Sequence, residues 1–220
     1  QLPDVMQGVV VGNEVLDAMP VQLLIRQQGV WLERGVALAD DGLGLRYQDR
    51  PTALQPPTEV EGAHDYLTEI HPQVEAFVRT LADRLQRGAA FFVDYGFPEA
   101  EYYHPQRHMG TLMCHQLHRA DPDPLSEVGR KDITAHVNFT GVAVAAQEAG
   151  LHVLGYTSQG HFLMNCGLPQ LLADADFAQR HTAQKLFNEH EMGELFKVLA
   201  LGTSEWWPLG FASGDRTHRL

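Results

Sequence analysis

Cysteine is scarce in this sequence: Cys114 and Cys166 are the only two among 220 residues, and they form no CxxC pair. Two thiols cannot make the disulfide framework of a small secreted protein. We therefore expect a reducing compartment and predict a cytoplasmic location. No apolar run has the length of a membrane span, and the first residues, QLPDVMQG, lack the basic start and apolar core of a signal peptide.

Positive charge is also scarce, with 16 Lys and Arg against 28 Asp and Glu and a net charge of −12. Nucleic-acid-binding proteins usually present a basic face, so this balance argues against a nucleic acid as the partner. Hydrophobic residues make up 44% of the chain, which is the composition of an ordinary globular protein with a sizeable core. The length suits one large domain or two small ones.

Several short enzyme motifs are missing, including the P-loop, GxGxxG and GxSxG. Four histidines crowd one segment beside Cys114, and they are His104, His108, His115 and His118. They show neither an HExxH pattern nor the paired spacing of a zinc site. We therefore interpret them as loop histidines and predict no metal, while a metal-dependent hydrolase is a remote alternative.

The elements that are present alternate between strands and helices. Residues 8–13 contain a continuous apolar run, which is typical of a parallel strand buried on both faces. A helix is expected at 72–87, with Pro72 at its first position and Gly88 as its stop. Another apolar run at 89–95 completes a strand–helix–strand unit and predicts an α/β fold with a parallel sheet. The other expected elements are an antiparallel segment at 21–47, an inserted loop at 97–133, a helix at 138–149, a strand at 151–157, helices within 159–190 and a strand at 195–202.

Acidic side chains follow the first strand directly. In open α/β sheets, ligands bind at the carboxyl ends of the strands, and this rule selects the turn from Asn13 to Asp17 and the turn from Asp94 to Gly96. On one helical turn, Glu14 and Asp17 would share a face and could bind a cation. The alternative is that both acids only accept hydrogen bonds from amides at a helix N-terminus. The residues alone leave both interpretations open and favour the second.

Seven stretches of the sequence resemble one known family, the MidA-type S-adenosylmethionine-dependent methyltransferases. This family includes the mitochondrial methyltransferase that assists complex I assembly. The stretches are GNEVLDAMPV, TEIHP, RGAAFFVDYGFPEAEYYHPQR, GTLMCHQLHRADPDPL, DITAHVNF, GYTSQGHFL and EMGELFKVLALG. The resemblance implies the class I methyltransferase fold, a Rossmann-like α/β sheet in which these 220 residues supply the fourth to seventh strands, with helices interrupting the hairpin between the last two.

The resemblance also implies S-adenosylmethionine as cofactor and a protein substrate, with arginine as the methyl acceptor. A guanidinium is a permanent cation and a poor nucleophile, so paired carboxylates suit it. We expect Glu14 and Asp17 to bind the substrate and His136 to accept a proton, although a structural role for this histidine is equally open. The residues expected on the cofactor side are Asn13, Asp94, Tyr95 and Gly96.

The family's first strand and its glycine-rich loop do not occur in these 220 residues. We therefore expect the 220 residues to be the C-terminal half of a longer protein. The strand at 8–13 would then have an unpaired edge, and this portion alone should bind no cofactor. The loop at 97–133 is expected to cover the substrate cleft; its residues Tyr102, Tyr103, His104, Arg107 and His118 follow a strand end. A non-catalytic assembly factor is the other class considered, and the sequence does not predict the oligomeric state.

Overall fold

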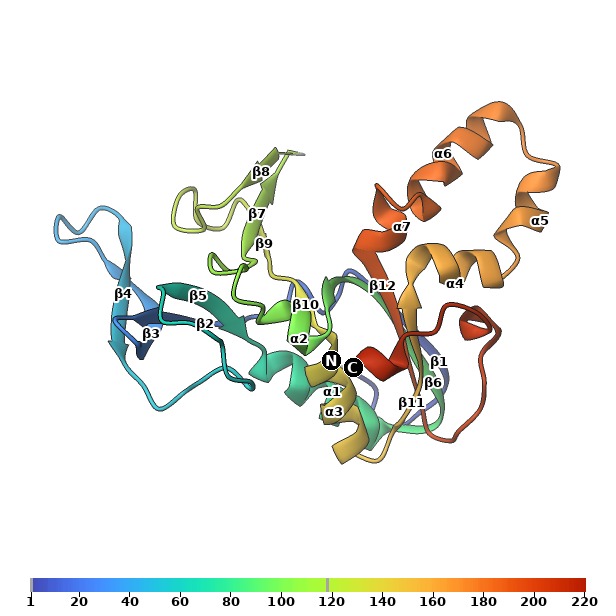
Figure 1. Cartoon of the computed structure of the whole chain (residues 1–220), viewed down its shortest axis with the longest axis horizontal. Coiled ribbons are helices and arrows are strands. Elements are labelled where there is room, and N and C mark those ends of the chain that lie inside the picture. Colours follow the sequence, from blue (N-terminus) through green and yellow to red (C-terminus); the bar gives the residue numbers. More distant parts are fainter. Residues whose placement is uncertain (1, 118) are drawn as a thin grey trace.

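A computed structural model describes residues 2–117 and 119–220. His118, which we expected near the substrate cleft, lies outside the described residues. The main sheet has the strand order β1-β6-β12-β11, with bounds Met6–Asn13, Leu85–Phe97, Phe196–Gly202 and His152–Ser158 (Figure 1). β1 is parallel to β6, whereas β12 is antiparallel to both β6 and β11. The four main strands expected from the sequence are therefore confirmed.

Two helices, α1 (Pro72–Arg84) and α3 (Phe139–Glu148), pack on each other beside the main sheet. Their apolar faces and the sheet enclose one core, which includes Val78, Leu81, Phe92, Val142 and Leu199. Asn138 caps α3 as its residue type suggests, because its side chain accepts a hydrogen bond from the amide of Gly141. In Figure 1 the two helices lie below the carboxyl ends of β1 and β6.

The boundary between α1 and β6 differs from the expected one. The helix was predicted to reach residue 87, but it ends at Arg84, because Leu85 is already extended and buried as the first residue of β6. Gly88 therefore lies inside the strand rather than at a helix stop. Its φ is +144°, and a Cβ atom there would come within 1.7 Å of the carbonyl oxygen of Gly8, so glycine allows β1 to approach.

Strand β1 lies at the edge of the main sheet, and the prediction that it is buried on both faces is wrong. Val9 and Val11 are each 69% exposed. Among the described residues β1 pairs with β6 only, which confirms the predicted unpaired edge. Continuous apolar sequence predicts a strand well, but the same pattern does not say how many neighbours the strand has.

The segment after β1 forms an antiparallel sheet of its own, in the order β4-β3-β2-β5. The predicted segment, 21–47, is correct in kind but too short. Its strands are β2 (Gln22–Gln27), β3 (Val30–Leu38), β4 (Leu45–Pro51) and β5 (Tyr66–Ile70). β5 was missed because it pairs with β2 across almost 40 residues of chain, a long-range contact that no local pattern predicts.

Residues 97–133 are not simply a loop, which corrects that prediction. They contain α2 (Glu99–Tyr102) and the first two strands of a small sheet, β8-β7-β9. These strands are short and partly polar, namely β7 (Met113–Gln116), β8 (Arg119–Asp121) and β9 (Asp132–Thr134), and β10 (Val137–Asn138) then pairs with the end of β6. Strands of two to four residues are too short to show alternation in the sequence.

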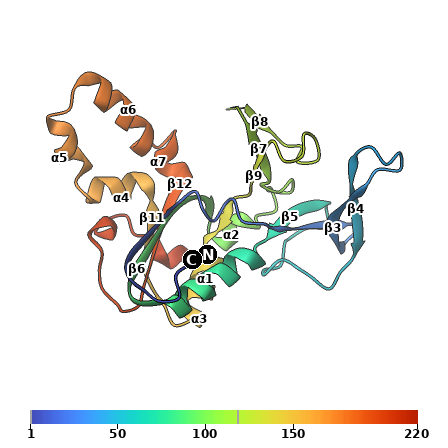
Figure 2. The same ribbon diagram turned by 180° about the vertical axis from the view of Figure 1, so that it is seen from behind.

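Helices interrupt the connection between β11 and β12, as the resemblance implies. They are α4 (Gln159–Asn165), α5 (Leu168–Ala173), α6 (Phe177–Phe187) and α7 (Met192–Leu195). The helical insertion and the antiparallel sheet β4-β3-β2-β5 lie on opposite sides of the main sheet, and Figure 2 shows the same separation from behind. No helix among the described residues is both long and apolar enough to cross a membrane.

Candidate functional site

A cavity of about 740 Å³ opens at the carboxyl ends of β1 and β6. Its walls come from both strand ends and from the segment between α2 and β10. The lining residues are Glu14, Tyr95, Arg107, Met109, Gly110, Thr111, Leu112, Met113, His115, Ala120, Pro122, Asp132, Thr134 and His136. The expected position of residues 97–133 close to Glu14 is therefore confirmed, and the cavity lies at the sheet edge where α/β proteins bind ligands.

Glu14 is exposed and lies on the wall of this cavity. Its backbone has φ +50°, an uncommon conformation for a residue other than glycine, and its amide donates to the carbonyl of Val93 at 2.9 Å. Asn13, also exposed, donates from its side-chain amide to Glu14 Oε1 at 3.3 Å. A left-handed residue directly after a strand turns the chain sharply, and such outliers recur at functional sites.

Asp94, at the end of β6, has the opposite environment because it is only 1% exposed. Its Oδ2 accepts hydrogen bonds from the amides of Val15, Leu16 and Asp17 at 3.2, 3.0 and 3.3 Å. Its Oδ1 accepts from the amide of Tyr95 at 3.0 Å. Asp94 thus fixes the turn that follows β1, and this carboxylate faces the protein rather than the cavity.

The turn after β1 contains no helix, so Glu14 and Asp17 do not share a helical face. The sequence interpretation of both acids as helix caps is also wrong, because Asp94 is the residue that accepts from these amides. Burial and, next, the neighbouring Asp17 carboxylate raise the pKa of Asp94 to about 7, although the amide hydrogen bonds act in the other direction.

Asp17 is buried, at 3% exposed, and does not line the cavity. Its Oδ2 accepts a hydrogen bond from the hydroxyl of Tyr95, while its Oδ1 is buried and has no partner among the described residues. Tyr95 itself is on the cavity wall. The structure therefore brings Glu14 to the cavity directly and connects Asp17 to it only through Tyr95.

His136 lies on the same wall, with its ring 5.3 Å from that of Tyr95. Its backbone is fixed on both sides, since its amide donates to Thr111 Oγ1 and its carbonyl accepts from His71 Nε2, each at 3.0 Å. Its Nδ1 is buried and finds no hydrogen-bond partner within residues 2–117 and 119–220. Burial, with further contributions from Arg107 and Lys197, lowers the pKa of His136 to about 4, so its imidazole is neutral at pH 7.

Gly96 is covered by the protein. It pairs with Val137 of β10, and a Cβ atom at this position would lie 2.1 Å from the carbonyl oxygen of Val137. Of the four residues expected on the cofactor side, Asn13 is exposed and Tyr95 lines the cavity. The other two, Asp94 and Gly96, have protein groups as their immediate neighbours.

Sequence reasoning missed several cavity residues, among them Thr111, His115 and Thr134. Thr111 is held by Glu69, a fully buried carboxylate that accepts from the Thr111 amide at 2.8 Å and from the Tyr102 hydroxyl at 2.9 Å. Thr111 and His115 lie in the family stretch GTLMCHQLHRADPDPL and Thr134 lies in DITAHVNF, and these stretches were the available signal. Residue pattern alone gave none, because the segment has no regular periodicity.

No three His, Cys, Asp or Glu side chains gather closely enough to hold a metal ion in the described ranges 2–117 and 119–220. His104 instead accepts from the amide of Gln106 through Nδ1, and its carbonyl accepts from the Tyr66 hydroxyl. The interpretation of this residue as a hydrogen-bonded loop histidine is consistent with these contacts.

A family model of S-adenosyl-L-methionine-dependent methyltransferases matches residues 1–157, which is most of the chain. The chain belongs to this family. A relative from Drosophila melanogaster, "Protein arginine methyltransferase NDUFAF7 homolog, mitochondrial", is 31% identical over 91% of this chain and 49% of its own length. The Caenorhabditis elegans protein of the same name is 26% identical over 74% of this chain and 38% of its own length. The chain thus spans half the length, or less, of these curated relatives.

Two crystal structures of Burkholderia thailandensis proteins match the whole chain with a TM-score of 0.94. One is bound to S-adenosyl-homocysteine, is 48% identical to this methyltransferase-family chain and is covered over 60% of its length. The other, a native structure of an uncharacterized protein, is 49% identical and covered over 62%. The methyltransferase fold expected from the resemblance is confirmed.

Proposed function

We propose that these residues form the acceptor side of an S-adenosylmethionine-dependent methyltransferase and that a protein arginine is the methyl acceptor. The observation that carries the proposal is the exposed carboxylate of Glu14 on a 740 Å³ cavity at the carboxyl ends of the strands. Family membership supports the reaction class. The acceptor class rests on the names of two relatives, which are protein arginine methyltransferases.

The exposed polar groups at the end of β1 fit the proposed cofactor. S-adenosylmethionine, when bound, supplies a methyl group carried on a sulfonium cation. Asn13 and Glu14 offer an amide and a carboxylate at the sheet edge where ligands of α/β proteins bind. A carboxylate is the side chain that suits a neighbouring cation. We assign Asn13, at the end of β1, to the cofactor and leave out the buried Asp94.

Glu14 is assigned to the acceptor. A guanidinium has five N–H donors in a planar fork, and a carboxylate can accept two of them in parallel. This contact would hold one guanidinium nitrogen in a fixed orientation, and orientation is a large part of the rate enhancement in such displacements. Tyr95, whose hydroxyl is held by Asp17, borders the same space. Asp17 therefore acts by positioning Tyr95.

A guanidinium nitrogen that gains a methyl group must lose a proton. The neutral imidazole of His136 is on the cavity wall, and because its Nδ1 is buried we assign its Nε2 as the atom that accepts this proton. A pKa of about 4 makes it a weak base but keeps it unprotonated at neutral pH.

The cytoplasmic location stays a prediction that rests on the cysteine content alone.

The proposal is tested with the natural full-length protein, S-adenosylmethionine labelled in its methyl group, and short peptides that contain either arginine or lysine. We expect label on the arginine peptide, recovered as methylarginine after hydrolysis and identified by mass spectrometry. Label on lysine would contradict arginine as the acceptor but would still support methyl transfer from S-adenosylmethionine. No transfer to any peptide or protein, despite saturable S-adenosyl-homocysteine binding, would favour the non-catalytic assembly factor.

A further inference from the structure

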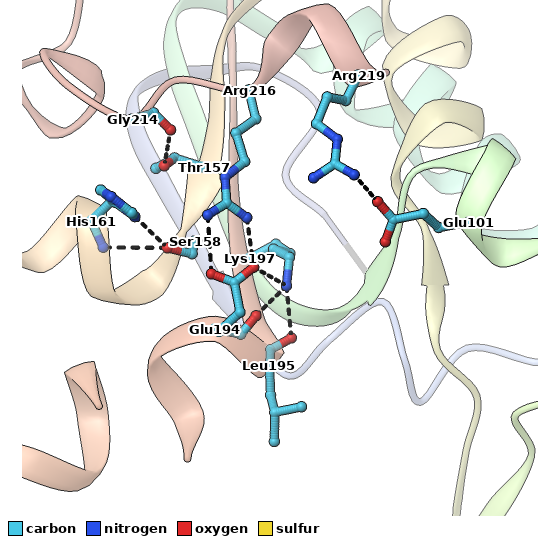
Figure 3. Close-up of polar contacts among 10 residues, drawn as sticks. All are labelled: Glu101, Thr157, Ser158, His161, Glu194, Leu195, Lys197, Gly214, Arg216 and Arg219. Atoms are coloured by element: carbon cyan, nitrogen blue, oxygen red, sulfur yellow. Dashed lines mark hydrogen bonds and ion pairs between the residues drawn. The ribbon is translucent and has the colours of Figure 1, made fainter. Parts of the chain in front are cut away.

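A second pocket, of about 220 Å³, lies between the end of β6, the strand β11 and the start of β12. We call it the Lys197 pocket. Its charged lining residues are Lys197, Arg216 and Arg219 together with Glu101 and Glu194, as Figure 3 shows. Three cations against two carboxylates give an excess of one positive charge. This is unusual in a chain whose net charge is −12.

The ion pairs inside the pocket leave the positive charge incompletely neutralised. Arg216 forms a bidentate contact with Glu194, with its Nη1 and Nη2 at 2.5 and 3.1 Å from the two carboxylate oxygens. Lys197 Nζ lies 3.6 Å from the same carboxylate and donates to the carbonyls of Glu194 and Leu195. Glu194 therefore serves two cations, and Arg219 pairs with Glu101 separately.

Lys197 is also poorly solvated, since it is only 7% exposed. Burial lowers the pKa of its ammonium group, which means that the surroundings do not fully compensate for lost water. A buried cation that shares its counter-ion is stabilised by any further negative charge brought beside it. The pocket is therefore chemically suited to an anion.

Tyr156 also lines the pocket, and its buried hydroxyl has no hydrogen-bond partner among the described residues. Tyr156 is 1% exposed, and its ring packs against Phe139 at 5.2 Å. Tyr156 lines the pocket together with Glu101 and Arg216. Leaving a buried hydroxyl unpaired costs about 1–3 kcal/mol, so a bound acceptor would be favourable there.

We infer that the Lys197 pocket binds an oxyanion, either a carboxylate or a phosphate group, with the Tyr156 hydroxyl and the Arg219 guanidinium as donors. Arg219 makes one side-chain hydrogen bond among the described residues and so has N–H groups to spare. The pocket adjoins the candidate active site through Phe97, which lines the pocket and whose ring lies 5.3 Å from that of His136. The anion is therefore carried by the methyl acceptor or is a free small ion.

The site is tested first by titrating the natural full-length protein with inorganic phosphate in an isothermal calorimeter. We expect saturable binding of one phosphate with a Kd of about 1 mM or tighter, which is the affinity of a modest polar site. A featureless titration up to about 50 mM, well above that Kd, would overturn the inference. This measurement needs no cofactor, acceptor or methyl transfer, so it succeeds or fails independently of the proposed function.

Two variants assign the binding to this pocket. Tyr156→Phe and Arg219→Gln should each weaken phosphate binding about tenfold, because each removes one donor to a charged acceptor. Lys185→Gln, which removes an exposed cation of α6 outside the pocket, is the matched control and should leave the Kd unchanged. Equal phosphate affinity in all three variants would contradict the assignment. In the absence of phosphate, the melting temperature of Tyr156→Phe should not fall, since its hydroxyl has no protein partner.

A last arm identifies the source of the anion and is the only part that rests on the proposed function. Two short arginine peptides are compared that differ in one neighbouring glutamate or glutamine. If the acceptor carries the anion, the glutamate peptide binds more tightly and phosphate displaces it. If the two peptides bind equally while phosphate still saturates the pocket, the ligand is a free ion. Either result supports the site.

Discussion

The carboxyl ends of β1 and β6 lie side by side in the main sheet, and each carries an acidic residue, but the two carboxylates have opposite surroundings. Glu14 is exposed on the wall of the cavity, whereas Asp94 is 1% exposed and accepts four backbone amides. Three of those amides belong to the turn from Val15 to Asp17, which directly follows Glu14. Asp94 thus fixes the chain next to Glu14.

The difference separates binding from positioning. An exposed carboxylate keeps its acceptor sites free for a ligand, while a buried one is already occupied by the protein. Asp17 shows the same distinction, because it is buried and holds Tyr95 rather than facing the cavity. We therefore expect changes at Glu14 to affect methyl transfer and changes at Asp94 to affect stability first.

The largest effect is expected for Glu14→Gln in the full-length protein. Loss of one preorganised charged contact in an active site typically lowers turnover by about 100- to 1,000-fold. The melting temperature should stay within the range of a surface substitution, because Glu14 is exposed. Methyl transfer and thermal unfolding are measured in parallel, with the exposed Glu61→Gln as the charge-matched control. Full activity in Glu14→Gln would show that Glu14 does not contact the methyl acceptor.

The next largest effect concerns stability. Asp94→Ala leaves the amides of Val15, Leu16, Asp17 and Tyr95 without their acceptor, and we expect a loss of about 3 kcal/mol in the free energy of unfolding. Asp94→Asn retains an oxygen and should lose less. Urea denaturation provides the measurement, and Asn13→Ala at the exposed strand end, expected within about 0.5 kcal/mol of the natural protein, is the comparison.

The free energy of unfolding should also depend on pH, because of His136. Burial lowers the pKa of His136 to about 4, below the value of 6.5 in the unfolded chain. Its stabilising contribution is therefore present above pH 6.5 and is lost as the pH falls toward 4, by about 2 kcal/mol between pH 7.5 and pH 5. The raised pKa of Asp94 has the opposite effect on stability as the pH falls over this range. To isolate the contribution of His136, the natural protein and His136→Gln are therefore compared by urea denaturation at pH 7.5 and at pH 5. An identical pH dependence in the two proteins would show that His136 is not buried as described.

The smallest effect is expected for Tyr95→Phe, which removes the hydrogen bond to Asp17 and leaves both oxygens of that buried carboxylate unpaired. We expect a loss of about 1–2 kcal/mol in stability. Because Tyr95 borders the cavity, KM for the acceptor should also rise, with little change in kcat. Steady-state kinetics measures KM and kcat separately. A change confined to kcat would instead place Tyr95 in the chemical step.

The sequence predicted the main strands because each is a continuous apolar run bounded by turn residues, as in 89–95. It predicted that Asn13 and Glu14 follow a strand end, because the apolar run stops there. The sequence did not predict the direction of each side chain. Asp17 was expected beside Glu14 because a helical turn was assumed. The left-handed backbone of Glu14 and the inward orientation of Asp94 depend on contacts between residues about 80 positions apart.

The Lys197 pocket could not be predicted for a similar reason. Glu101, Tyr156 and Arg219 are far apart in the sequence, and each has an ordinary local environment there. They meet because β12 inserts antiparallel between β6 and β11, which brings the end of β6 and the C-terminal residues together. Strand order, rather than any local pattern, therefore created this pocket.

A double-mutant cycle on peptide binding measures whether Glu14 contacts the guanidinium of the acceptor. The natural protein and Glu14→Gln are each titrated with an arginine peptide and with its citrulline counterpart, which is neutral and similar in shape. We expect a coupling energy of about 1.5–3 kcal/mol, so that either change alone weakens binding nearly as much as both together. Strictly additive effects would contradict it and would show that Glu14 does not bind the acceptor.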